Sequence, residues 1–427
     1  MTFLGRKDQT NRSYVEGYPA PRVWLTEAGV CIYKNTMPSR DFRPRVAALV
    51  LGLVCFAAPH VFAAMTPEEV KAFEGYRVLA EKGDVKAQNK LGECYGRGKG
   101  VSGDLAQAVK WYRLAADKGL AEAQVHLGTS MQYGWGVGKN LDEAFKWYRR
   151  AADQGSTDGQ VNLGNCYLFG FGVKEDAAQA VAWYRKSAEK GNVEGQYSLA
   201  RCFKDGSGVP KDMAEAVRWY RKAADLGHAR SQMVLGDCYR FGMGVAKDIV
   251  ESTCWWRKAA DQGWSEAQCE MGRRYEDGFG VTKDLAEAVR WYELADTGIS
   301  FVASVRLGDM YRMGVGVPRN PEVAIKFYLK VARLGSRDAL YELGNCYWNG
   351  EGVAKDLIEA YAYLNLAGVH DELARDQLAN LEKEMSLDAR LLGQQRTKEL
   401  KKELEGRLDT PGDLLKAVEQ ESAKKGA

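Results

Sequence analysis

A period of 36 residues constrains the fold of this chain more than any other feature of its sequence. A Leu-Gly pair, or a near variant of it, begins at evenly spaced positions: Leu91, Leu127, Leu163, Leu199, Leu235, Met271, Leu307 and Leu343. A large aromatic residue recurs with the same step: Trp111, Trp147, Trp183, Trp219, Trp255, Trp291, Phe327 and Tyr363. A fixed period of this length is typical of repeat proteins, in which stacked units share one continuous core.

Each unit is predicted to form two helices separated by a glycine turn. Small and apolar residues lie at helical spacing around the Leu-Gly pair, as in residues 160–167. Gly-x-Gly-Val follows in every unit and is expected to end the first helix, because glycine adopts left-handed backbone at little cost. An N-cap residue then opens the second helix: Asp104, Asn140, Asp176, Asp212, Asp248, Asp284, Asn320 and Asp356. Glu or Gln three residues later, as in Asp212 and Glu215, predicts a reciprocal capping box.

The repeated string resembles the Sel-one-like repeat, a relative of the tetratricopeptide repeat. It reads Ala-x-x-Gln-x-x-Leu-Gly-x-x-Tyr-x-x-Gly-x-Gly-Val-x-x-Asp, followed by Ala-x-x-Trp-Tyr-x-x-Ala-Ala, and the resemblance covers residues 64–386. It implies an all-α fold, a right-handed α-solenoid of about eight helix-turn-helix repeats with terminal capping helices. Members of the family mostly act as adaptors, which implies a protein or peptide partner.

The ends of the solenoid are predicted from capping signals. Thr66 and Pro67 are expected to open a lone helix of the second type, ahead of the first complete unit. Ser386 is expected to cap a charged helix in residues 387–427, whose last residues fray. These helices would close the stack with polar outer faces.

The segment before the repeats has the features of an export signal. Arg43 and Arg45 precede an apolar run, residues 46–58, and Val61-Phe62-Ala63 follows with small residues at the positions that a signal peptidase reads. The run of 13 residues is too short for a helix to cross about 30 Å of hydrocarbon. We therefore expect a signal peptide in residues 37–63, cleavage after Ala63, a periplasmic or secreted product and no stable membrane span afterwards.

Residues 1–36 fit this signal poorly, because a basic region of such length rarely precedes an apolar run. Met37 would start a signal of ordinary length. We interpret residues 1–36 as an upstream start-codon artefact or a disordered extension. The alternative for residues 46–58 is a core helix, although nothing around them supplies a partner.

Charge gives no reason to expect nucleic acid as the partner. The first 63 residues carry eight Lys and Arg and four acidic residues, which leaves 52 basic and 53 acidic residues in the body. A nearly neutral body lacks the electrostatic attraction on which binding to phosphate backbones depends.

A search for catalytic, cofactor and metal sites gives only weak candidates. The Trp-Tyr pairs are better explained as wedges in the core than as a cofactor platform, and the glycine turns connect helix to helix, unlike phosphate loops. His126, His228 and His370 are scattered, and we expect no acid or Cys near them at metal spacing. We therefore predict no catalytic, cofactor or metal residues.

One enzymatic alternative stays open. Ser187 and Lys190 match the Ser-x-x-Lys pattern of penicillin-interacting enzymes, although the companion signatures are missing. Some secreted members of the resembling family have been described as binding or hydrolysing β-lactams, so the resemblance keeps this function as a rival. A purely structural envelope component is the second rival.

The seven cysteines of the body suggest small buried residues more than disulfides. Five of them share one position, three residues after the Leu: Cys94, Cys166, Cys202, Cys238 and Cys346. Equivalent positions in stacked helices lie about 8–10 Å apart, beyond the limit of about 7 Å for bridging. Cys254 and Cys269, on consecutive helices, are the one pair for which a disulfide stays open.

The turn between the two helices supplies the candidate binding surface. Its two variable positions are polar in some units but bulky and apolar in others, and loop tips normally face water. The candidate protein-binding residues are Tyr133, Trp135, Phe169, Phe171, Phe241, Met243, Phe279 and Met313. The alternative is that each aromatic side chain folds back on the neighbouring turn.

A second, weaker candidate surface follows the first helices. Polar residues there lie two positions after the Leu: Glu93, Thr129, Asn165, Arg201, Asp237, Arg273, Asp309 and Asn345.

From these observations we expect an exported repeat scaffold or adaptor that binds a protein or peptide in the cell envelope.

Overall fold

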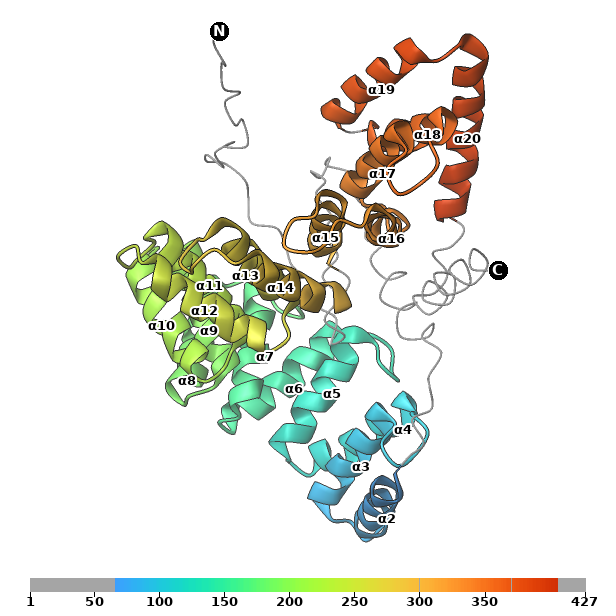
Figure 1. Ribbon diagram of the computed structural model, residues 1–427. Helices are drawn as coiled ribbons and strands as arrows, with labels where there is room; N and C mark the ends of the chain where they lie inside the picture. The colour runs from blue at the N-terminus through green and yellow to red at the C-terminus, as the bar shows by residue number, and fades with distance from the viewer. Residues whose placement is uncertain (1–65, 299, 370, 406–427) are drawn as a thin grey trace. The chain divides into compact units, whose positions relative to one another are not determined.

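The computed structural model is all-helical in the residues it describes, which are 66–298, 300–369 and 371–405 (Figure 1). It contains 19 helices and no strand within these ranges, and the predicted all-α class is confirmed. Three segments lie outside the described residues: residues 1–36, interpreted as a start-codon artefact or extension, the predicted signal peptide at 37–63, and the tail beyond residue 405. No described helix is long and apolar enough to cross a membrane.

The predicted helix pairs are present in every repeat. The first helices are α3 (Val85–Arg97), α5 (Ala121–Tyr133), α7 (Thr157–Phe169), α9 (Val193–Asp205), α11 (Ala229–Phe241), α13 (Ser265–Asp277), α15 (Phe301–Met313) and α17 (Arg337–Asn349). The second helices are α4 (Leu105–Asp117), α6 (Leu141–Asp153), α8 (Ala177–Glu189), α10 (Met213–Asp225), α12 (Ile249–Asp261), α14 (Leu285–Thr297), α16 (Pro321–Ala332) and α18 (Leu357–Ala367). Helix α2 (Pro67–Glu81) precedes them, and α19 (Glu372–Glu384) and α20 (Leu387–Glu405) follow.

Each helix from α2 to α18 packs on the next along the chain, and α20 packs back on α18. The strongest contacts lie within a pair, as between α7 and α8, and the next strongest join one pair to the following one, as between α6 and α7. First helices also touch each other, as α5 touches α7 and α7 touches α9. This nearest-neighbour packing, which the order of helices in Figure 1 follows, is that of an α-solenoid.

The caps of the second helices are as predicted, but the reciprocal box is not. Asp212 accepts a hydrogen bond from the Glu215 amide at 2.9 Å, and the other seven caps do the same for the amide three residues on. The Glu215 carboxylate accepts from the Trp219 indole at 3.0 Å instead of turning back to the cap. The prediction of a box in the repeats was therefore wrong, because the carboxylate has other partners: an indole one turn away at Glu215 and Glu251, and a basic side chain at Glu143 and Glu287. Thr66 and Glu69 do form a box, at the start of α2.

Within a repeat, the tyrosine of the Trp-Tyr pair packs on the glycine of the Leu-Gly pair. A Cβ added to Gly164 would lie 2.5 Å from the Tyr184 ring, and one added to Gly128 would lie 2.8 Å from Tyr148. The glycine therefore lets the two helices approach until the tyrosine ring is fully buried. The Trp residues face the preceding repeat: the Arg149 guanidinium, for example, lies over the Trp183 ring at 5.8 Å, and Arg221 lies over Trp255 at 5.6 Å.

A glutamine on the first helix ties it to the end of the preceding repeat. The Gln232 amide donates to the Ala224 carbonyl at 3.1 Å, and the same bond recurs at other first helices, from Gln88, Gln124, Gln160, Gln196 and Gln268. These side chains are buried, so each satisfies a carbonyl at a helix end that water does not reach.

The second glycine of each turn brings backbone against backbone between repeats. Gly172 has φ +69°, and a Cβ there would lie 2.2 Å from the Leu141 carbonyl oxygen at the start of the preceding second helix. Gly100, Gly136, Gly208, Gly244, Gly280, Gly316 and Gly352 make the equivalent approach to the repeat before them. Glycine is thus required there for two reasons, a left-handed backbone and the lack of space for any side chain.

We expect Gly172→Ala to lower the free energy of unfolding by about 2–4 kcal/mol, because it combines left-handed strain with displacement of the preceding repeat. Gly191→Ala is the matched control in the same repeat: φ is +85° there but no atom lies within 4 Å of the added Cβ. That variant should lose only about 1 kcal/mol. Urea unfolding followed by circular dichroism measures both, and equal losses would contradict the assigned contact.

Candidate functional site

The tip of each glycine turn has one outer and one inner position. The outer position, the last residue of the first helix, is exposed in every repeat, including Tyr133, Phe169, Phe241 and Met313. The inner position lies between the two glycines and is more variable: Trp135 and Met243 are exposed, whereas Phe171 and Phe279 are half-buried. Six of the eight predicted binding residues therefore face solvent.

The aromatic side chains of the tips make two kinds of contact, one within a single turn and one between neighbouring turns. The rings of Tyr133 and Trp135 stack with their centroids 4.9 Å apart, and Phe169 lies 5.6 Å from Phe171, both within one turn. The Arg240 guanidinium instead bridges two turns, since it lies over Phe241 at 5.1 Å and over Phe279 at 5.2 Å. Folding back on a neighbouring turn, the alternative interpretation, thus applies to the inner Phe279 but leaves Phe241 61% exposed.

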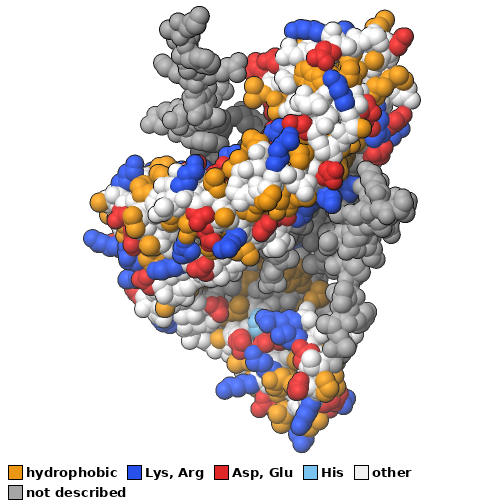
Figure 2. Space-filling view, viewed as in Figure 1, with side chains coloured by type: hydrophobic (Ala, Val, Ile, Leu, Met, Phe, Trp, Pro, Cys, Tyr) orange, Lys and Arg blue, Asp and Glu red, His pale blue; other side chains and the backbone are white. Residues whose placement is uncertain are grey.

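The exposed apolar tips form two groups along the repeats. Asp205 and Ser207 occupy the turn between that of Phe169 and that of Phe241. We call the first group the front tips, made of the exposed Tyr133, Trp135 and Phe169 together with the half-buried Phe171. On the face in view in Figure 2, hydrophobic, basic and acidic side chains are interspersed, with no extended area of one charge.

Three of the eight polar positions on the first helices accept hydrogen bonds from buried tyrosines within the fold. The Tyr184 hydroxyl donates to Asn165 at 2.6 Å, that of Tyr148 donates to Thr129 at 3.1 Å and that of Tyr328 donates to Asp309 at 2.8 Å. These bonds satisfy the hydroxyls of buried tyrosines. The sequence suggested a second contact surface here, and the structure uses at least these three side chains internally.

A buried arginine occupies one of the small-residue positions of the core. Arg274 on α13 is 1% exposed, and stands where five other repeats have the buried cysteine. Its guanidinium donates to Thr253 at 2.6 Å and to Ser252 at 2.9 Å, and its Nε lies 3.2 Å from a Glu270 oxygen. Ser252 and Thr253 replace the Ala-Val found at this position in four other repeats, so the partners of the buried charge changed with it.

Two acidic groups on the first-helix face, Glu270 and Asp237, lie near this arginine, and Glu266 lies near both of them. Burial, followed by repulsion from Glu270, raises the pKa of Asp237 to about 6. Burial also raises the pKa of Glu266. Glu270 pairs with Arg240 at 3.3 Å as well as with Arg274 at 3.2 Å, so its carboxylate lies between two guanidinium groups.

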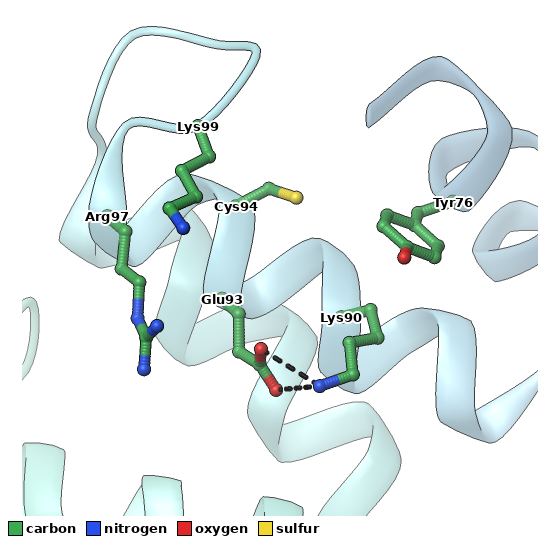
Figure 3. Close-up of a pocket in the computed structure, with 6 residues that line it drawn as sticks. All are labelled: Tyr76, Lys90, Glu93, Cys94, Arg97 and Lys99. Carbon is green, nitrogen blue, oxygen red and sulfur yellow. Dashed lines mark hydrogen bonds and ion pairs between the residues drawn. The ribbon is translucent and has the colours of Figure 1, made fainter. Parts of the chain in front are cut away.

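The N-terminal repeat has a pocket of about 260 Å³ lined by Tyr76 of α2 and by five residues of α3 and its turn (Figure 3). The five are Lys90, Glu93, Cys94, Arg97 and Lys99. Lys90 donates to both carboxylate oxygens of Glu93, at 2.9 and 3.0 Å, and these bonds are drawn in Figure 3. Cationic side chains thus predominate around a small, open hollow.

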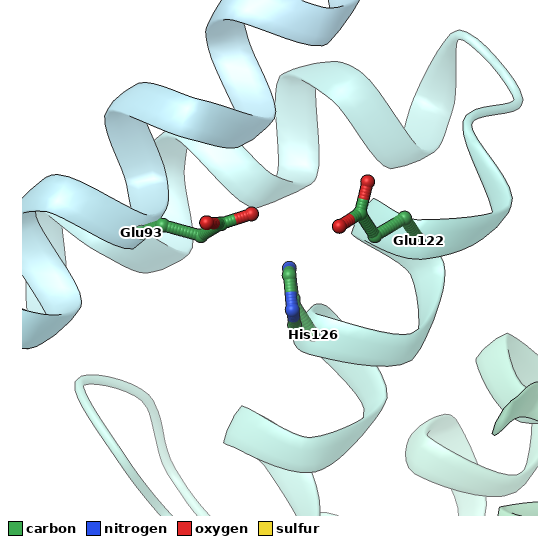
Figure 4. A group of neighbouring side chains, drawn as sticks. All are labelled: Glu93, Glu122 and His126. Atoms are coloured by element: carbon green, nitrogen blue, oxygen red, sulfur yellow. The ribbon is translucent and has the colours of Figure 1, made fainter.

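The expectation that no acid lies near His126 at metal spacing was wrong. One ligand atom each from Glu93, Glu122 and His126 lies within 4.8 Å of the others, as Figure 4 shows. Glu122 precedes His126 by one helical turn on α5, which places both on one face, and Glu93 reaches them from α3. The four-residue spacing was visible in the sequence, but the third residue needed the packing of two repeats.

Comparison with known proteins decides the family. The family model for the Sel1 repeat matches residues 85–120, 121–156, 157–192, 193–228, 229–264, 265–295, 302–336 and 337–368. The chain belongs to the Sel1 repeat family. The matched segments begin at the first residue of each first helix in all but the seventh repeat, so the family's unit is the helix pair described above.

Solved structures of Sel1 repeat proteins resemble the chain. A Sel1 repeat protein from Oxalobacter formigenes is 30% identical over 81% of this chain and 97% of its own, with a TM-score of 0.53. A protective antigen present in uropathogenic Escherichia coli strains is 30% identical over 77% of this chain and 86% of its own, with a TM-score of 0.41. No curated protein matches the chain.

The Ser-x-x-Lys match lies inside ordinary Sel1 packing. Ser187 is fully buried, and its hydroxyl donates to the Thr157 carbonyl at 2.9 Å. The Lys190 ammonium turns to the Gly155 carbonyl at 2.9 Å, as Lys118 turns to Gly83 in an earlier repeat. The lysine therefore joins neighbouring repeats, whereas the serine hydroxyl bonds within its own repeat and is not open to a substrate.

The cysteines of the Sel1 repeats are free thiols in the structure. The five at the shared position are buried, and burial raises the pKa of Cys202 and Cys238 to about 11. Thiols with such pKa values are poor nucleophiles at neutral pH. Cys254 and Cys269, for which pairing stayed open, are likewise free, and Cys254 is exposed.

Arg274→Cys should lower the free energy of unfolding by about 3–5 kcal/mol, because it leaves buried polar groups without their partner. Adding Ser252→Ala and Thr253→Val restores the residues of the other repeats and should recover most of the loss. Urea unfolding of the single and triple variants measures this. A triple variant no more stable than the single one would contradict a local polar network.

Asp237→Asn should raise the free energy of unfolding at pH 7 by about 1–3 kcal/mol. The folded-state pKa, about 6, lies above the ordinary value, so the folded protein binds the proton more tightly than the unfolded chain does. The wild type therefore gains stability from this group as pH falls from 7 to about 4, and the advantage of the variant should disappear at the lower pH. Urea unfolding at both pH values tests the sign.

Proposed function

We propose that this chain is an exported Sel1 repeat scaffold that holds a protein or peptide partner in the cell envelope through the front tips. The observation that carries the proposal is the exposure of large apolar side chains in consecutive turns, Tyr133 (54%), Trp135 (47%) and Phe169 (47%). A Tyr, Trp or Phe side chain removes about 150–250 Å² from water when it becomes buried, which makes such residues effective anchors in interfaces.

The fold supports binding at the turns because they are held rigidly. Each turn is fixed to the preceding repeat by the close approach of its second glycine, as Gly136 approaches Leu105 and Gly172 approaches Leu141. The stacked rings of Tyr133 and Trp135 are thereby presented with little remaining freedom. A partner that covers them loses less conformational entropy than it would with mobile loops.

Export is proposed from the sequence that precedes α2. The apolar run at 46–58 and the small-residue exit at Val61–Ala63 end a few residues before the helix starts at Pro67. A cut after Ala63 would remove the signal and keep every described repeat. Sequencing the amino terminus of the purified mature protein tests this part of the proposal, and a chain that still begins at Met1 or Met37 would contradict it.

The proposal contains no chemical step. The buried Ser187 hydroxyl offers no support for the rival function as a β-lactam-binding or β-lactam-hydrolysing enzyme. A chromogenic β-lactam assay on the pure protein tests the rival directly, and turnover that disappears in Ser187→Ala would overturn the proposal of a non-catalytic scaffold.

Replacing Trp135 and Phe169 together by Glu should abolish capture of the partner, because two charges would be placed in an apolar contact that must exclude water. The measurement is chemical cross-linking in intact cells, followed by purification and mass spectrometry of the captured protein. A loss of at least about tenfold in the cross-linked product is expected.

The control places two carboxylates at the same turn positions of polar turns, by Ser207→Glu and Asn349→Glu. That variant should capture the partner as the wild type does. Equal capture by the front-tip variant would exclude this surface, and failure of the wild type to capture any defined protein would favour a purely structural component of the envelope.

A further inference from the structure

Three positions on the first helices meet at each junction between repeats. One position lies two residues after the Leu of a first helix. The other two are the second and sixth residues of the first helix in the following repeat. We call these three positions the junction triad. The triad is Glu93, Glu122 and His126 at the first junction, Asp237, Glu266 and Glu270 at the fifth, and Asp309, Asp338 and Glu342 at the seventh. At the remaining junctions between repeats, at least one of the three is a residue that does not bind metals well.

The later triads are neutralised by arginines that are themselves partly or fully buried. Glu270 is bound by the half-buried Arg240 and the fully buried Arg274, in addition to the exposed Arg273. Arg312, whose side chain is 22% exposed, lies 3.2 Å from Glu342 and 3.9 Å from Asp309. A planar guanidinium held between helices is a fixed part of the packing, so these acids have permanent counter-ions.

The first triad has only a surface lysine as counter-ion. Lys90 is 44% exposed and lies 2.9 Å from Glu93 and 3.8 Å from Glu122. An exposed ion pair of this kind contributes little to stability, about 0–1 kcal/mol, so a divalent cation can displace the ammonium at little cost. Two carboxylates therefore share one replaceable charge.

The first triad is also the one that contains an imidazole. The Nδ1 atom of His126 is 2.9 Å from the Asn89 side-chain oxygen, and the amide nitrogen of Asn89 donates to Glu93 at 3.1 Å. Asn89 is 1% exposed and uses its nitrogen on Glu93, so its oxygen accepts the Nδ1 proton. The Nε2 lone pair is then left facing the two carboxylates, as Figure 4 shows.

We propose that Glu93, Glu122 and His126 bind a divalent transition-metal ion of the Zn²⁺ type, with Asn89 as the residue that orients two of the ligands. Carboxylate oxygen and neutral imidazole are ligands that Zn²⁺ accepts, and metal-binding histidines almost always donate their other ring proton to an oxygen. Burial lowers the pKa of His126, which keeps the imidazole neutral near pH 7. In the part of the chain that the structure describes, no other group of His, Cys, Asp and Glu comes together closely enough.

Such an ion would fasten α3 to α5 across the first junction and keep coordination positions open to water or to a donor from a partner. Three protein ligands are fewer than the four of a closed structural zinc site. The inference does not depend on the front tips, so either proposal can fail without the other.

The test is calorimetric titration of the metal-free full chain with Zn²⁺ alone. One binding event per chain is expected, and Glu122→Gln should weaken it by at least about tenfold. Lys90→Met should strengthen binding several-fold, because it removes the competing ammonium. A merely incidental surface site would not respond in opposite directions to these two substitutions.

Two control variants address other donors in the chain. His228→Asn removes the imidazole that lies 3.3 Å from Glu194 without a third ligand, and Cys254→Ser removes the exposed thiol. Both should leave Zn²⁺ binding unchanged. Titration with Co²⁺ should show no thiolate charge-transfer absorption, since the proposed ligands are oxygen and nitrogen atoms.

His126→Asn introduces the residue that stands at position 162, the equivalent place in the next repeat, and should also abolish binding. Glu122 is 55% exposed, so its substitution tests the site even where a change at His126 alters folding. The proposal is overturned by the absence of Zn²⁺ binding, by equal binding in Glu122→Gln, or by binding that is lost in Cys254→Ser.

Discussion

Backbone meets backbone at every junction between repeats, where the second turn glycine lies against the carbonyl at the start of the preceding second helix. This approach sets the distance between units, because neither side can yield without moving a whole helix. The buried glutamine that bonds to the preceding repeat and the tyrosine that packs on the Leu-Gly glycine both depend on that distance. The period of 36 residues is thus maintained by contacts that an inserted or deleted residue would misalign.

Departures from the repeat pattern come in sets that compensate one another. Arg274 replaces a small residue and is accompanied by Ser252 and Thr253, whose hydroxyls accept its protons. Asp296 stands where most other repeats have Ala, and Ser304 stands in place of the usual Gln. The Asp296 carboxylate accepts a hydrogen bond from the Ser304 hydroxyl, and the Lys330 ammonium lies 2.8 Å from the same carboxylate. Buried polar groups can thus enter a repeated core only with partners from neighbouring helices.

The helix pairs, their bounds and their caps could be predicted from the sequence because each depends on local signals such as Asp212 or the turn glycines. The Trp-Tyr pairs were identified as wedges in the core, and the structure divides this role: the Tyr packs on the Leu-Gly glycine of its own repeat, and the Trp faces the preceding repeat. The cluster of Glu93 with His126 was missed because it joins residues of different repeats. The turn tips were identified from composition, but which of them are covered, such as Phe279, depended on an arginine of the preceding repeat.

The outer tip positions, such as Tyr133 and Asp205, are exposed in every repeat and lie outside the buried core of the stack. A change of residue there alters what the solenoid presents without disturbing how it stacks. The binding surface can therefore change one turn at a time while the packing of the helix pairs stays the same. The polar and the aromatic tips are then separate determinants of partner specificity, placed one after another along the solenoid.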